Sequence, residues 1–506
     1  MLFKITSAAL HGIEAYPVEV EVDISAGFPT FVMVGLPDAA VRESKERVRA
    51  ALKNCGYDLE SKRVTINLAP ADRRKEGSAF DLPIALGFLA FLEVVPAARL
   101  RDHLFVGELA LDGRLKPVRG ALPIALTARE RGFRGLVVPG ANAREAALVR
   151  GLEVYALEDI VRVVRLLREP QAVAPCRFEE AELVGPADYA VDFEDVKGQQ
   201  HVKRALEVAA AGAHNVLLVG PPGAGKTMLA RRLPSILPDM SYDEILEVTR
   251  VYSAAGLLAG SGTVGTRPFR APHHTVSDAG LVGGGAVPKP GEVSLAHHGL
   301  LFLDELPEFK RKVLEDLRQP VEDGRVTVVR SGYSVTFPSA FQLVAAMNPC
   351  ADVRRGLLGR EADCTDSEKA RYYAKISGPL LDRIDIQLEV PEVKFRDIVS
   401  RTPAESSAAI RARVTAARRI QTGRFAGRRL FANAQMGPKE VKQFCPLPPE
   451  AERLLEMAVT KLGFSARAYD RVLKVARTIA DLEASEGIAT PHVSEAVQYR
   501  MMDRLR

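Results

Sequence analysis

The segment that most constrains the fold is NVLLVGPPGAGKTMLARRL, residues 215–233. A β-rich apolar run leads into a glycine turn that ends in Lys226 and Thr227, and a helix-forming stretch follows, as a phosphate loop requires. Glycines let backbone N–H groups turn toward phosphate oxygens, while Lys226 neutralises phosphate charge and Thr227 offers a hydroxyl to Mg²⁺. We therefore expect ATP and Mg²⁺ as cofactors. The residues expected to bind the nucleotide are Gly220, Pro221, Pro222, Gly223, Ala224, Gly225, Lys226 and Thr227.

A second apolar strand carries the acids that nucleotide hydrolysis requires. The run LLFLDE, residues 300–305, ends in Asp304 and Glu305. A carboxylate at the end of a strand beside a phosphate loop can bind the same Mg²⁺ as Thr227, and its neighbour can accept the proton of the attacking water. Asp304 is therefore expected to bind the nucleotide-associated Mg²⁺, and Glu305 to be the catalytic base.

The chain has 506 residues, which is too long for a single hydrophobic core, since such cores stop growing at roughly 250–300 residues. Residues 1–168 mix strand and helix patterns, and residues 169–189 combine three prolines with clustered acids, which is typical of a linker. Short apolar strands alternate with helices over 190–395, as in a parallel sheet covered on both faces. Residues 396–506 are mostly helical. The sequence predicts a multidomain α/β protein.

Composition argues against a membrane or secreted protein. The longest apolar run, residues 82–92, is about half as long as a membrane helix, and the N-terminus lacks a signal-peptide pattern. The cysteines lack the density of a disulfide framework, so reduced thiols and a cytoplasmic location are expected. In residues 396–506 basic side chains outnumber acidic ones by 20 to 12, which favours a polyanionic partner. The five cysteines are Cys55, Cys176, Cys350, Cys364 and Cys445.

Further segments carry a resemblance to a known family. GEVSLAHHGLLFLDELPEF (291–309), AAMNP (345–349) and SGPLLDRIDI (377–386) resemble the magnesium-chelatase-like branch of the AAA+ ATPases, and more narrowly the ComM/YifB family. The resemblance extends over essentially the whole chain. It implies a hexameric, ATP-dependent DNA helicase that promotes branch migration when incoming DNA recombines during natural transformation. It also implies single-stranded or branched DNA and recombination proteins as partners, a homohexamer formed on nucleotide or DNA, and no membrane partner.

The resemblance also implies roles for residues outside the phosphate loop. Asn348 would orient the attacking water, Arg383 would reach the γ-phosphate of a neighbouring subunit, and Arg467 would sense the nucleotide from a C-terminal helical lid. Arg471 is an alternative to Arg467. Because an arginine from another subunit stabilises the charge that develops in phosphoryl transfer, hydrolysis would require a ring.

The N-terminal region, residues 1–168, resembles the Lon-protease proteolytic fold, which is a ribosomal S5 domain 2-like α/β fold. The segment KEGSAFDLP lies over the nucleophile region of that family, with Ser78 as the nearest serine. The lysine that should activate this serine is replaced by Leu122. We therefore expect this domain to be proteolytically inactive.

A hairpin and an arginine run are the candidate DNA contacts. Residues 322–341 alternate on both sides of a turn expected at Ser331–Gly332, where related ring helicases carry a pore hairpin, so Arg330 near its tip is expected to contact phosphates. Seven arginines and no acid lie between positions 411 and 429, which is typical either of phosphate binding or of a solvated helix face. In this run the expected DNA contacts are Arg418, Arg419, Arg428 and Arg429.

No metal site is expected beyond the nucleotide. The histidine pairs at 273–274 and 297–298 are adjacent in sequence and therefore do not share a helix face. Cys350 and Cys364 are what remains of a cysteine pattern that many relatives carry, and two thiolates cannot fill a tetrahedral zinc site. Two other functions stay open: a chelatase-type ATPase motor for metal insertion, and a Lon-like protease or protein-remodelling regulator.

Overall fold

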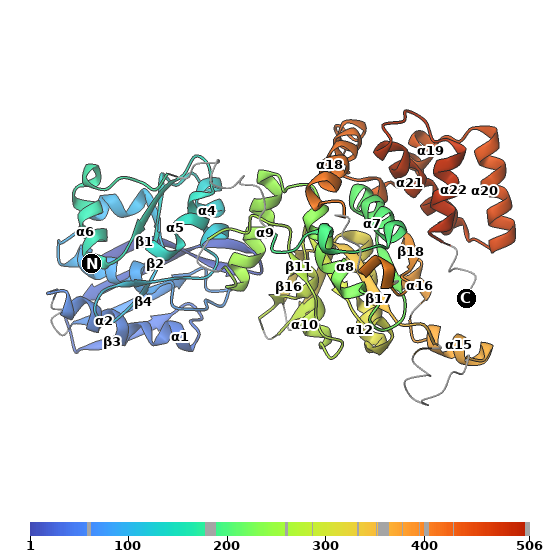
Figure 1. The fold of residues 1–506 in the computed structure, drawn as a ribbon. Coiled ribbons are helices and arrows are strands. Elements are labelled where there is room, and N and C mark those ends of the chain that lie inside the picture. Colours follow the sequence, from blue (N-terminus) through green and yellow to red (C-terminus); the bar gives the residue numbers. More distant parts are fainter. Residues whose placement is uncertain are drawn as a thin grey trace. The chain divides into compact units, whose positions relative to one another are not determined.

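The computed structural model of the chain (Figure 1) describes residues 1–57, 62–177, 189–258, 262–285, 287–330, 333–350, 352, 364–376, 378–393, 395–398, 404–428 and 430–500. It divides into two compact units. The N-terminal unit contains Met1–Gly185 together with Ser241–Gly265, and the ATPase unit contains Pro186–Met240 together with Thr266–Arg506. Residues 241–265, which follow the phosphate-loop helix in sequence, therefore belong to the N-terminal unit.

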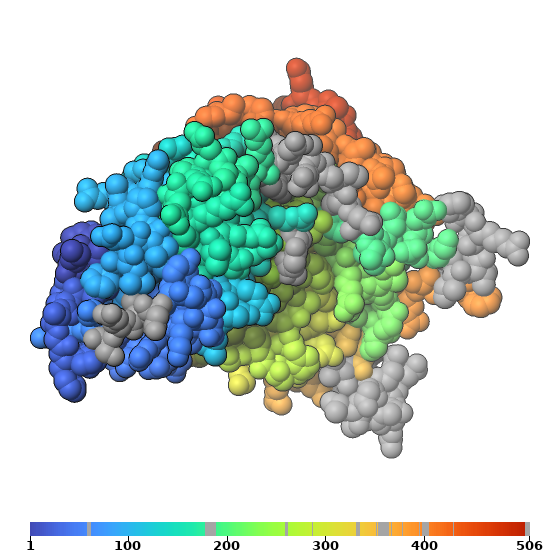
Figure 2. Space-filling view, turned by 90° about the vertical axis from the view of Figure 1, so that its left-hand side faces the viewer, coloured from blue at the N-terminus to red at the C-terminus, as the bar shows by residue number. Residues whose placement is uncertain are grey.

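A seven-stranded mixed sheet organises the N-terminal unit. Its first two strands form a long antiparallel hairpin in which Leu2 pairs with Asp23 and His11 with Glu14. Alternate residues of the second strand are buried, as expected for a strand with one face on the core. Residues 1–177 form the body coloured blue to teal in Figure 2. The strand order is β3 (Thr30–Val34), β4 (Arg63–Ala69), β2 (Glu14–Ser25), β1 (Leu2–His11), β5 (His103–Phe105), β8 (Gly135–Pro139) and β9 (Glu153–Leu157).

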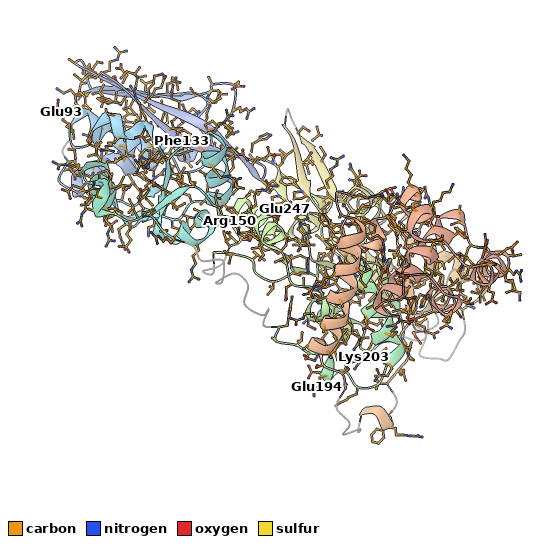
Figure 3. The ribbon with its side chains drawn as sticks, turned by 90° about the horizontal axis from the view of Figure 1, so that it is seen from above. Glu93, Phe133, Arg150, Glu194, Lys203 and Glu247 are labelled. Carbon is orange, nitrogen blue, oxygen red and sulfur yellow. A yellow bond between two sulfur atoms is a disulfide. The ribbon has the colours of Figure 1, made fainter. Side chains whose placement is uncertain are left out.

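Helix α9 (Tyr242–Ala255) is the part of residues 241–265 that packs on the N-terminal unit, against α4 (Ala121–Glu130). The Tyr242 ring lies 4.1 Å from the guanidinium of Arg150, which Figure 3 shows beside this helix. The buried Glu145 accepts hydrogen bonds from Ser253 of α9 and, at 2.6 Å, from Asn142. The other elements of this unit are α1 (Ala39–Arg42), α2 (Ser44–Asn54), α3 (Asp81–Phe91), β6 (Glu108–Leu109), β7 (Leu115–Lys116), α5 (Ala143–Ala147) and α6 (Ile160–Arg168).

A fully parallel five-stranded sheet organises the ATPase unit, and it confirms the predicted parallel sheet. All residues of its three central strands are buried, which is what a sheet covered on both faces requires. Val216 pairs with both Val344 and Ile386, so the carboxyl ends of these strands lie at one edge. The strand order is β11 (Phe269–Arg270), β14 (Leu300–Leu303), β17 (Gln342–Met347), β10 (Val216–Val219) and β18 (Ile386–Glu389).

The predicted helical C-terminal region is confirmed, and it shares its hydrophobic core with this sheet. Val414 of α18 (Ser407–Arg424) and Val472 of α21 (Ala466–Leu482) belong to the same buried cluster as Val216. The other helices of the unit are α7 (Gln200–Gly212), α8 (Lys226–Arg232), α10 (Asp278–Val282), α11 (Glu292–Leu295), α12 (Arg311–Asp316), α13 (Arg318–Asp323), α15 (Asp366–Tyr373), α16 (Gly378–Leu381), α17 (Phe395–Ile398), α19 (Pro438–Phe444), α20 (Pro449–Leu462) and α22 (Thr490–Gln498). Two antiparallel pairs complete the unit, β12 (Gly283–Gly284) with β13 (Lys289–Pro290) and β15 (Arg325–Arg330) with β16 (Tyr333–Pro338).

A buried lysine, Lys203, links two segments of the ATPase unit. Lys203 on α7 donates to the carbonyl oxygens of Phe193 at 3.2 Å and Val196 at 2.6 Å. It thereby holds the turn that contains Glu194, which lies at the same end of the unit in Figure 3. Burial lowers the pKa of Lys203 from its ordinary value.

One expectation about the cysteines is wrong. Cys350 and Cys364 form a disulfide, because the end of β17 and the start of α15 bring together two thiols that are 14 residues apart. Cys55, Cys176 and Cys445 are free thiols. None of the helices in the described ranges has the length and apolar character needed to cross a bilayer. The Lon-like fold of residues 1–168 stays a prediction.

Candidate nucleotide-binding site

The phosphate loop occupies the turn between β10 and α8. Gly220 leaves no room for a side chain, because a Cβ there would lie 2.1 Å from the Val390 carbonyl oxygen. Gly225 has a φ of +87°, in the left-handed region that favours glycine. Because the first backbone N–H groups of a helix have no intrahelical partner, α8 can donate them to an anion in this turn.

Lys226 lies at the centre of the site. Its Nζ donates to the carbonyl oxygens of Gly220 at 2.7 Å and Pro221 at 2.8 Å, and to Asn348 Oδ1 at 2.9 Å. Burial lowers the pKa of this ammonium from its ordinary value. Each of the three N–H groups of the ammonium therefore has an acceptor, and these bonds hold Lys226 Nζ against the phosphate loop.

Thr227 and Asp304 lie in direct contact. Thr227 Oγ1 donates to Asp304 Oδ2 at 2.7 Å, so the hydroxyl at the start of α8 meets the carboxylate at the end of β14. Hydroxyl and carboxylate oxygens are the hard ligands that Mg²⁺ prefers. This pair of side chains therefore fits the ion that the phosphate loop predicts.

Glu305 follows in an unusual backbone conformation. Its φ is +53°, which is strained for a residue with a side chain, and its N–H donates to Asp304 Oδ1 at 3.0 Å. The carboxylate is more than half exposed, and its Oε2 lies 3.3 Å from Nδ1 of His274. The turn thus leaves the carboxylate of Glu305 accessible to a water molecule.

Asn348 directly follows β17, the strand beside β10, which explains how it reaches Lys226. The carbonyl oxygen of Asn348 accepts a hydrogen bond at 2.8 Å from the hydroxyl of Tyr372 on α15. Burial raises the pKa of Tyr372, so this phenol stays protonated and remains a donor. The side-chain amide and the backbone carbonyl of Asn348 are therefore both held by hydrogen bonds.

Arg383 lies just before β18, with its guanidinium bound to its own chain. Its Nη1 donates to the Pro379 carbonyl oxygen at 2.7 Å, and its Nη2 donates to the carboxylate of Glu322. Its Nε is buried and has no hydrogen-bond partner among the described residues. The backbone is held as well, because Asn215 Nδ2 donates to the Arg383 carbonyl oxygen at 2.9 Å. The predicted finger is therefore paired with a carboxylate in cis.

The two candidate lid arginines have different surroundings. Arg467, in the first turn of α21, is 68% exposed and lies 4.0 Å from a carboxylate oxygen of Asp382. Arg471, one turn further along, is 15% exposed, donates to the Ile384 carbonyl oxygen at 3.2 Å and lies 3.6 Å from Asp385. Arg467 can therefore reach toward a ligand, whereas Arg471 is held within the protein.

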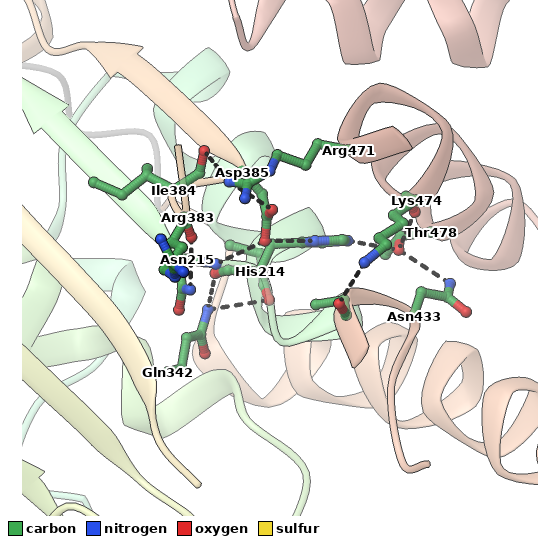
Figure 4. Close-up of polar contacts among 12 residues, drawn as sticks. His214, Asn215, Gln342, Arg383, Ile384, Asp385, Asn433, Arg471, Lys474 and Thr478 are labelled. Atoms are coloured by element: carbon green, nitrogen blue, oxygen red, sulfur yellow. Dashed lines mark hydrogen bonds and ion pairs between the residues drawn. The ribbon is translucent and has the colours of Figure 1, made fainter. Parts of the chain in front are cut away.

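Arg471 belongs to a polar network that joins α7, α21 and the residues before β18 (Figure 4). His214 Nδ1 lies 3.3 Å from Asp385 Oδ2, and His214 Nε2 lies 2.8 Å from Thr478 Oγ1. Burial would raise the pKa of Asp385, but the hydrogen bond with His214 and the charge of Arg471 outweigh it, so this pKa lies below its ordinary value. The network fixes the backbone that follows Arg383.

Two of the arginines proposed to bind DNA instead contact their own unit. Arg418 donates to the carbonyl oxygens of Ala211 at 3.0 Å and Ala210 at 2.8 Å, at the end of α7. Arg428 donates to Glu440 at 3.2 Å. Carbonyl groups at a helix end lack intrahelical partners, so Arg418 satisfies groups that the fold would otherwise leave unpaired.

The rest of the arginine run is divided. Arg419 is exposed on α18, and Arg429 lies outside the described residues. Three others form ion pairs: Arg411 with Asp239, Arg413 with Glu207 and Glu405, and Arg424 with Asp481. These acids lie outside the run in sequence, so the local excess of charge is largely compensated.

The hairpin predicted at 322–341 is confirmed by the pairing of β15 with β16. Arg330 pairs with Tyr333 at the end of the ladder, so Arg330 lies next to the tip. The turn expected at Ser331–Gly332 lies outside the described residues.

The predicted remnant of a protease site has no serine–lysine pair in its described contacts. The Ser78 hydroxyl donates to the carboxylate of Glu108. Lys75 is buried and donates to backbone carbonyl oxygens, that of Arg73 at 2.8 Å among them. Leu122 is fully buried. A lysine bound to carbonyl groups is not in a position to take a proton from Ser78.

Three residues at the ATPase site were missed by sequence reasoning. Glu322 is 61 positions from Arg383, and Tyr372 is 24 positions from Asn348, so no local spacing marks either pair. His274 was noted as one of a histidine pair, but its place beside Glu305 depends on how β11 aligns with β14.

Comparisons with known proteins agree with this geometry. The family model described as "Magnesium chelatase, subunit ChlI" matches residues 192–398. The model described as "Subunit ChlI of Mg-chelatase" matches residues 20–142, and "Magnesium chelatase, subunit ChlI C-terminal" matches residues 404–500. Family models of the magnesium-chelatase subunit ChlI thus match most of the chain, and the match over residues 192–398 places the ATPase core among the magnesium-chelatase-like AAA+ domains.

Similarity to individual proteins separates full-length relatives from partial ones. Competence protein ComM of Haemophilus influenzae and the uncharacterized protein YifB of Escherichia coli are each 45% identical over 502 residues, 99% of this chain and 97% of each relative. The magnesium-chelatase 67 kDa subunit of Chlorobaculum parvum is 28% identical over 173 residues, 34% of this chain and 25% of that subunit. The chain therefore belongs to the ComM/YifB family.

Proposed function

We propose that this protein hydrolyses ATP to move DNA, as a homohexameric helicase that promotes branch migration when incoming DNA recombines during natural transformation. The observation that carries the ATPase activity is one set of contacts, Lys226 with Asn348 at 2.9 Å and Thr227 with Asp304 at 2.7 Å. Asp304 and Asn348 directly follow the adjacent parallel strands β14 and β17, and Lys226 and Thr227 begin α8, the helix after the next strand, β10. Their positions match the sites of phosphate, Mg²⁺ and attacking water in phosphoryl transfer.

The chain's own residues divide the work of hydrolysis. Lys226 exchanges its carbonyl partners for oxygens of the β- and γ-phosphates. Glu305 accepts the proton of the attacking water, and Asn348 orients that water through its amide. Mg²⁺, held by Thr227 and Asp304, supplies positive charge against the phosphates when bound.

A second subunit completes the site. Arg383 reaches the γ-phosphate bound by its neighbour and stabilises the charge that develops in the transition state, which makes hydrolysis depend on the ring. Arg467 senses the same nucleotide from the start of α21, and its exposure supports this role over Arg471.

DNA is the proposed substrate of the motor. The β15–β16 hairpin carries Arg330 next to its tip, where a backbone phosphate can be bound without regard to sequence. The name of the full-length relative, Competence protein ComM, supports DNA from transformation as the source. In the arginine run the proposal retains Arg419 on α18, because Arg418 on the same helix and Arg428 after it already have partners in the fold. Recombination proteins are proposed as partners, and the cytoplasm as the location.

Residues 1–168 are proposed to form a Lon-protease-like domain without proteolytic activity. Ser78 bound to Glu108, and Leu122 at the place of the missing lysine, support the loss of activity. A serine-directed fluorophosphonate probe should leave Ser78 unlabelled.

One assay tests the proposed function. ATP turnover of the full chain is measured with and without single-stranded DNA, and movement of a synthetic three-stranded or four-way junction is followed under the same conditions. We expect DNA to stimulate turnover and the junction to be rearranged, with both activities absent from Lys226→Ala. If DNA neither raises turnover nor is rearranged, the DNA motor is wrong.

A chelatase motor is the second candidate, favoured by the descriptions of the three matching family models. The partial coverage of the chelatase subunit counts against it, since the alignment includes 25% of that protein. Stimulation of turnover by a porphyrin-loaded chelatase partner in place of DNA would favour this candidate.

A further inference from the structure

The ion pair between Arg383 and Glu322 engages the residue that the proposed motor needs in trans. Both terminal nitrogens of Arg383 have partners in the same chain, Pro379 and Glu322, and its side chain is 17% exposed. A guanidinium cannot donate the same N–H groups to a neighbour's γ-phosphate while Glu322 and Pro379 accept them. The described conformation therefore engages two of the five N–H groups of the guanidinium within its own chain.

Glu322 lies at the junction between α13 and the β15–β16 hairpin. It is the penultimate residue of α13, Gly324 follows with a φ of +64°, and β15 begins at Arg325. The hairpin is closed at this base, because Ser339 N–H donates to the Gly324 carbonyl oxygen at 2.8 Å. The carboxylate that holds the finger is thus three residues from the base of the proposed DNA contact.

The hairpin is built to transmit a displacement along its length. Its two strands pair in register from Arg325–Pro338 to Arg330–Tyr333. The hydroxyls of Thr327 and Thr336 lie 2.9 Å apart across the ladder. α13 packs directly against β15. A displacement of the described strands would therefore act on the helix that carries Glu322.

The ion pair between Arg383 and Glu322 is exposed enough on the Glu322 side to break and form again. Glu322 is 61% exposed, and ion pairs of exposed side chains are weak because water and salt screen them. The buried Nε of Arg383 lacks a partner among the described residues, so this conformation does not use all donors of the guanidinium. A γ-phosphate carries more negative charge than one carboxylate and can accept a bidentate contact.

Glu322 also faces the lid. The hydrogen bond from Arg383 lowers the pKa of Glu322, and the charges of Arg467 and Arg471 lower it further. The carboxylate is therefore ionised at neutral pH and lies within the field of the finger and both lid arginines.

We propose that Glu322 is a positioning residue that holds Arg383 within its own subunit until DNA loads the β15–β16 hairpin. Displacement of α13 by the loaded hairpin then separates the carboxylate from the guanidinium, and Arg383 becomes available to the nucleotide of the adjacent subunit. DNA thereby controls hydrolysis at a site that it does not touch. This inference rests on the proposed function, because it requires a ring and a DNA-bound hairpin.

The test compares steady-state ATP turnover of full-length wild type and Glu322→Gln, each with and without single-stranded DNA. We expect Glu322→Gln to raise the DNA-free kcat several-fold, toward the DNA-stimulated value of wild type, with KM for ATP little changed. The ratio of stimulated to basal turnover should fall toward one. Glu322→Asp keeps the charge and should restore part of the DNA dependence.

Two controls assign the effect to Arg383. Glu456→Gln removes an exposed carboxylate of α20, and it should behave as wild type. The double variant Glu322→Gln/Arg383→Ala should lose the gain in basal turnover, since the effect acts through the finger. Thermal melting and size-exclusion chromatography confirm that the variants fold and assemble.

The outcomes separate this inference from the proposed function. If DNA stimulates wild type and Glu322→Gln to the same ratio, or if Glu322→Gln lowers basal and stimulated turnover alike, the cis restraint is wrong and the motor stands. If DNA does not stimulate wild type, the proposed function fails and the restraint fails with it. If Glu322→Gln does not fold, the basal rate and stimulation ratio of Glu322→Asp decide, since the restraint requires this shortened carboxylate to show partly raised basal turnover.

Discussion

In the sequence, the phosphate loop and the arginine run at 411–429 both have the features of anion-binding segments. In the structure, their positive charges have different partners. At the phosphate loop, Lys226 is bound by carbonyl oxygens and an amide, none of which carries a formal charge. In the arginine run, Arg413 and Arg424 are paired with carboxylates, and Arg418 caps a helix. The ammonium of the loop has neutral hydrogen-bond partners and feels the carboxylates of Asp304 and Asp352 only through space, whereas most of the described charge on α18 is used to join the helix to the rest of its unit.

This difference shows what a run of like charges can indicate. A count of charges over a short segment includes the arginines but misses the acids that pair with them, because acids such as Glu207 and Asp481 lie far away in sequence. A phosphate loop is different, because its function depends on backbone geometry that a few consecutive residues determine. The same contrast applies to the finger, because Arg383 is bound by Glu322 in cis.

The largest expected effect tests the charge at the phosphate loop. Lys226→Ala removes the ammonium that faces the transition-state phosphates, and the loss of one such donor lowers turnover by about 10²- to 10³-fold. Steady-state ATP hydrolysis with DNA present measures it. Lys461→Ala on the exposed face of α20 is the matched control and should keep wild-type turnover. Turnover of Lys226→Ala within a factor of two of wild type would contradict the assignment of the loop.

The next effect tests whether Arg471 is a structural residue. Asp385→Asn weakens the contacts to Arg471 and His214, and breaking a buried ion pair costs about 3–5 kcal/mol, so the melting temperature at pH 7 should fall. Because the pKa of Asp385 lies below its ordinary value of about 3.9, this stabilisation is present above about pH 4 and is lost as the pH falls further. The difference in melting temperature between wild type and variant should therefore narrow on acidification.

An exposed acid supplies the control for this pH dependence. Glu450→Gln on α20 should change the free energy of unfolding by less than about 0.5 kcal/mol both at neutral and at acidic pH. A difference between Asp385→Asn and wild type that stays constant from pH 7 to pH 3 would show that folding does not lower the pKa of this carboxylate. Arg471 would then again be an alternative to Arg467 as the lid arginine that senses the nucleotide.

Two adjacent arginines divide the functions of α18. Arg418→Ala removes the side-chain donor to the Ala210 carbonyl oxygen and one of two donors to that of Ala211, which Gln421 also binds, and a carbonyl left unpaired costs about 1–3 kcal/mol of stability. Arg419→Ala, on the exposed side, should change stability by less than about 0.5 kcal/mol. DNA binding by fluorescence anisotropy should weaken for Arg419→Ala alone. If Arg418→Ala weakens DNA binding without loss of stability, the division between the two residues is wrong.

Sequence reasoning succeeded where the determinants are local. The apolar strands β10, β14 and β17, the glycine turn and the hairpin at 322–341 follow from composition and alternation over short stretches. Parallel pairing of those strands then brings Lys226, Asp304 and Asn348 to one edge of the sheet. The membership of residues 241–265 in the N-terminal unit was not foreseen, since helix α9 is amphipathic in the same way whichever unit its apolar face contacts.

The remaining misses share a physical cause. The disulfide between Cys350 and Cys364, the pair of Arg383 with Glu322, and the contact of Tyr372 with Asn348 each join residues that no periodicity relates. They depend on where a loop returns after leaving the sheet. Such contacts become predictable when tertiary positions are known.

The smallest expected effect tests the support of Asn348 from outside the loop. Tyr372→Phe removes the hydroxyl that donates to the Asn348 carbonyl oxygen, a hydrogen bond worth about 1 kcal/mol, so kcat should fall about fivefold. KM for ATP should change little, because Lys226 and the loop still bind the phosphates. The neighbouring Tyr373→Phe is the matched control and should keep wild-type kcat. Equal effects of the two substitutions, or an effect confined to KM, would contradict this prediction. Asn348 would then be positioned by β17 and Lys226 without help from α15. The phosphate-binding edge of the sheet would then depend only on the strands and the loop that the sequence motifs mark.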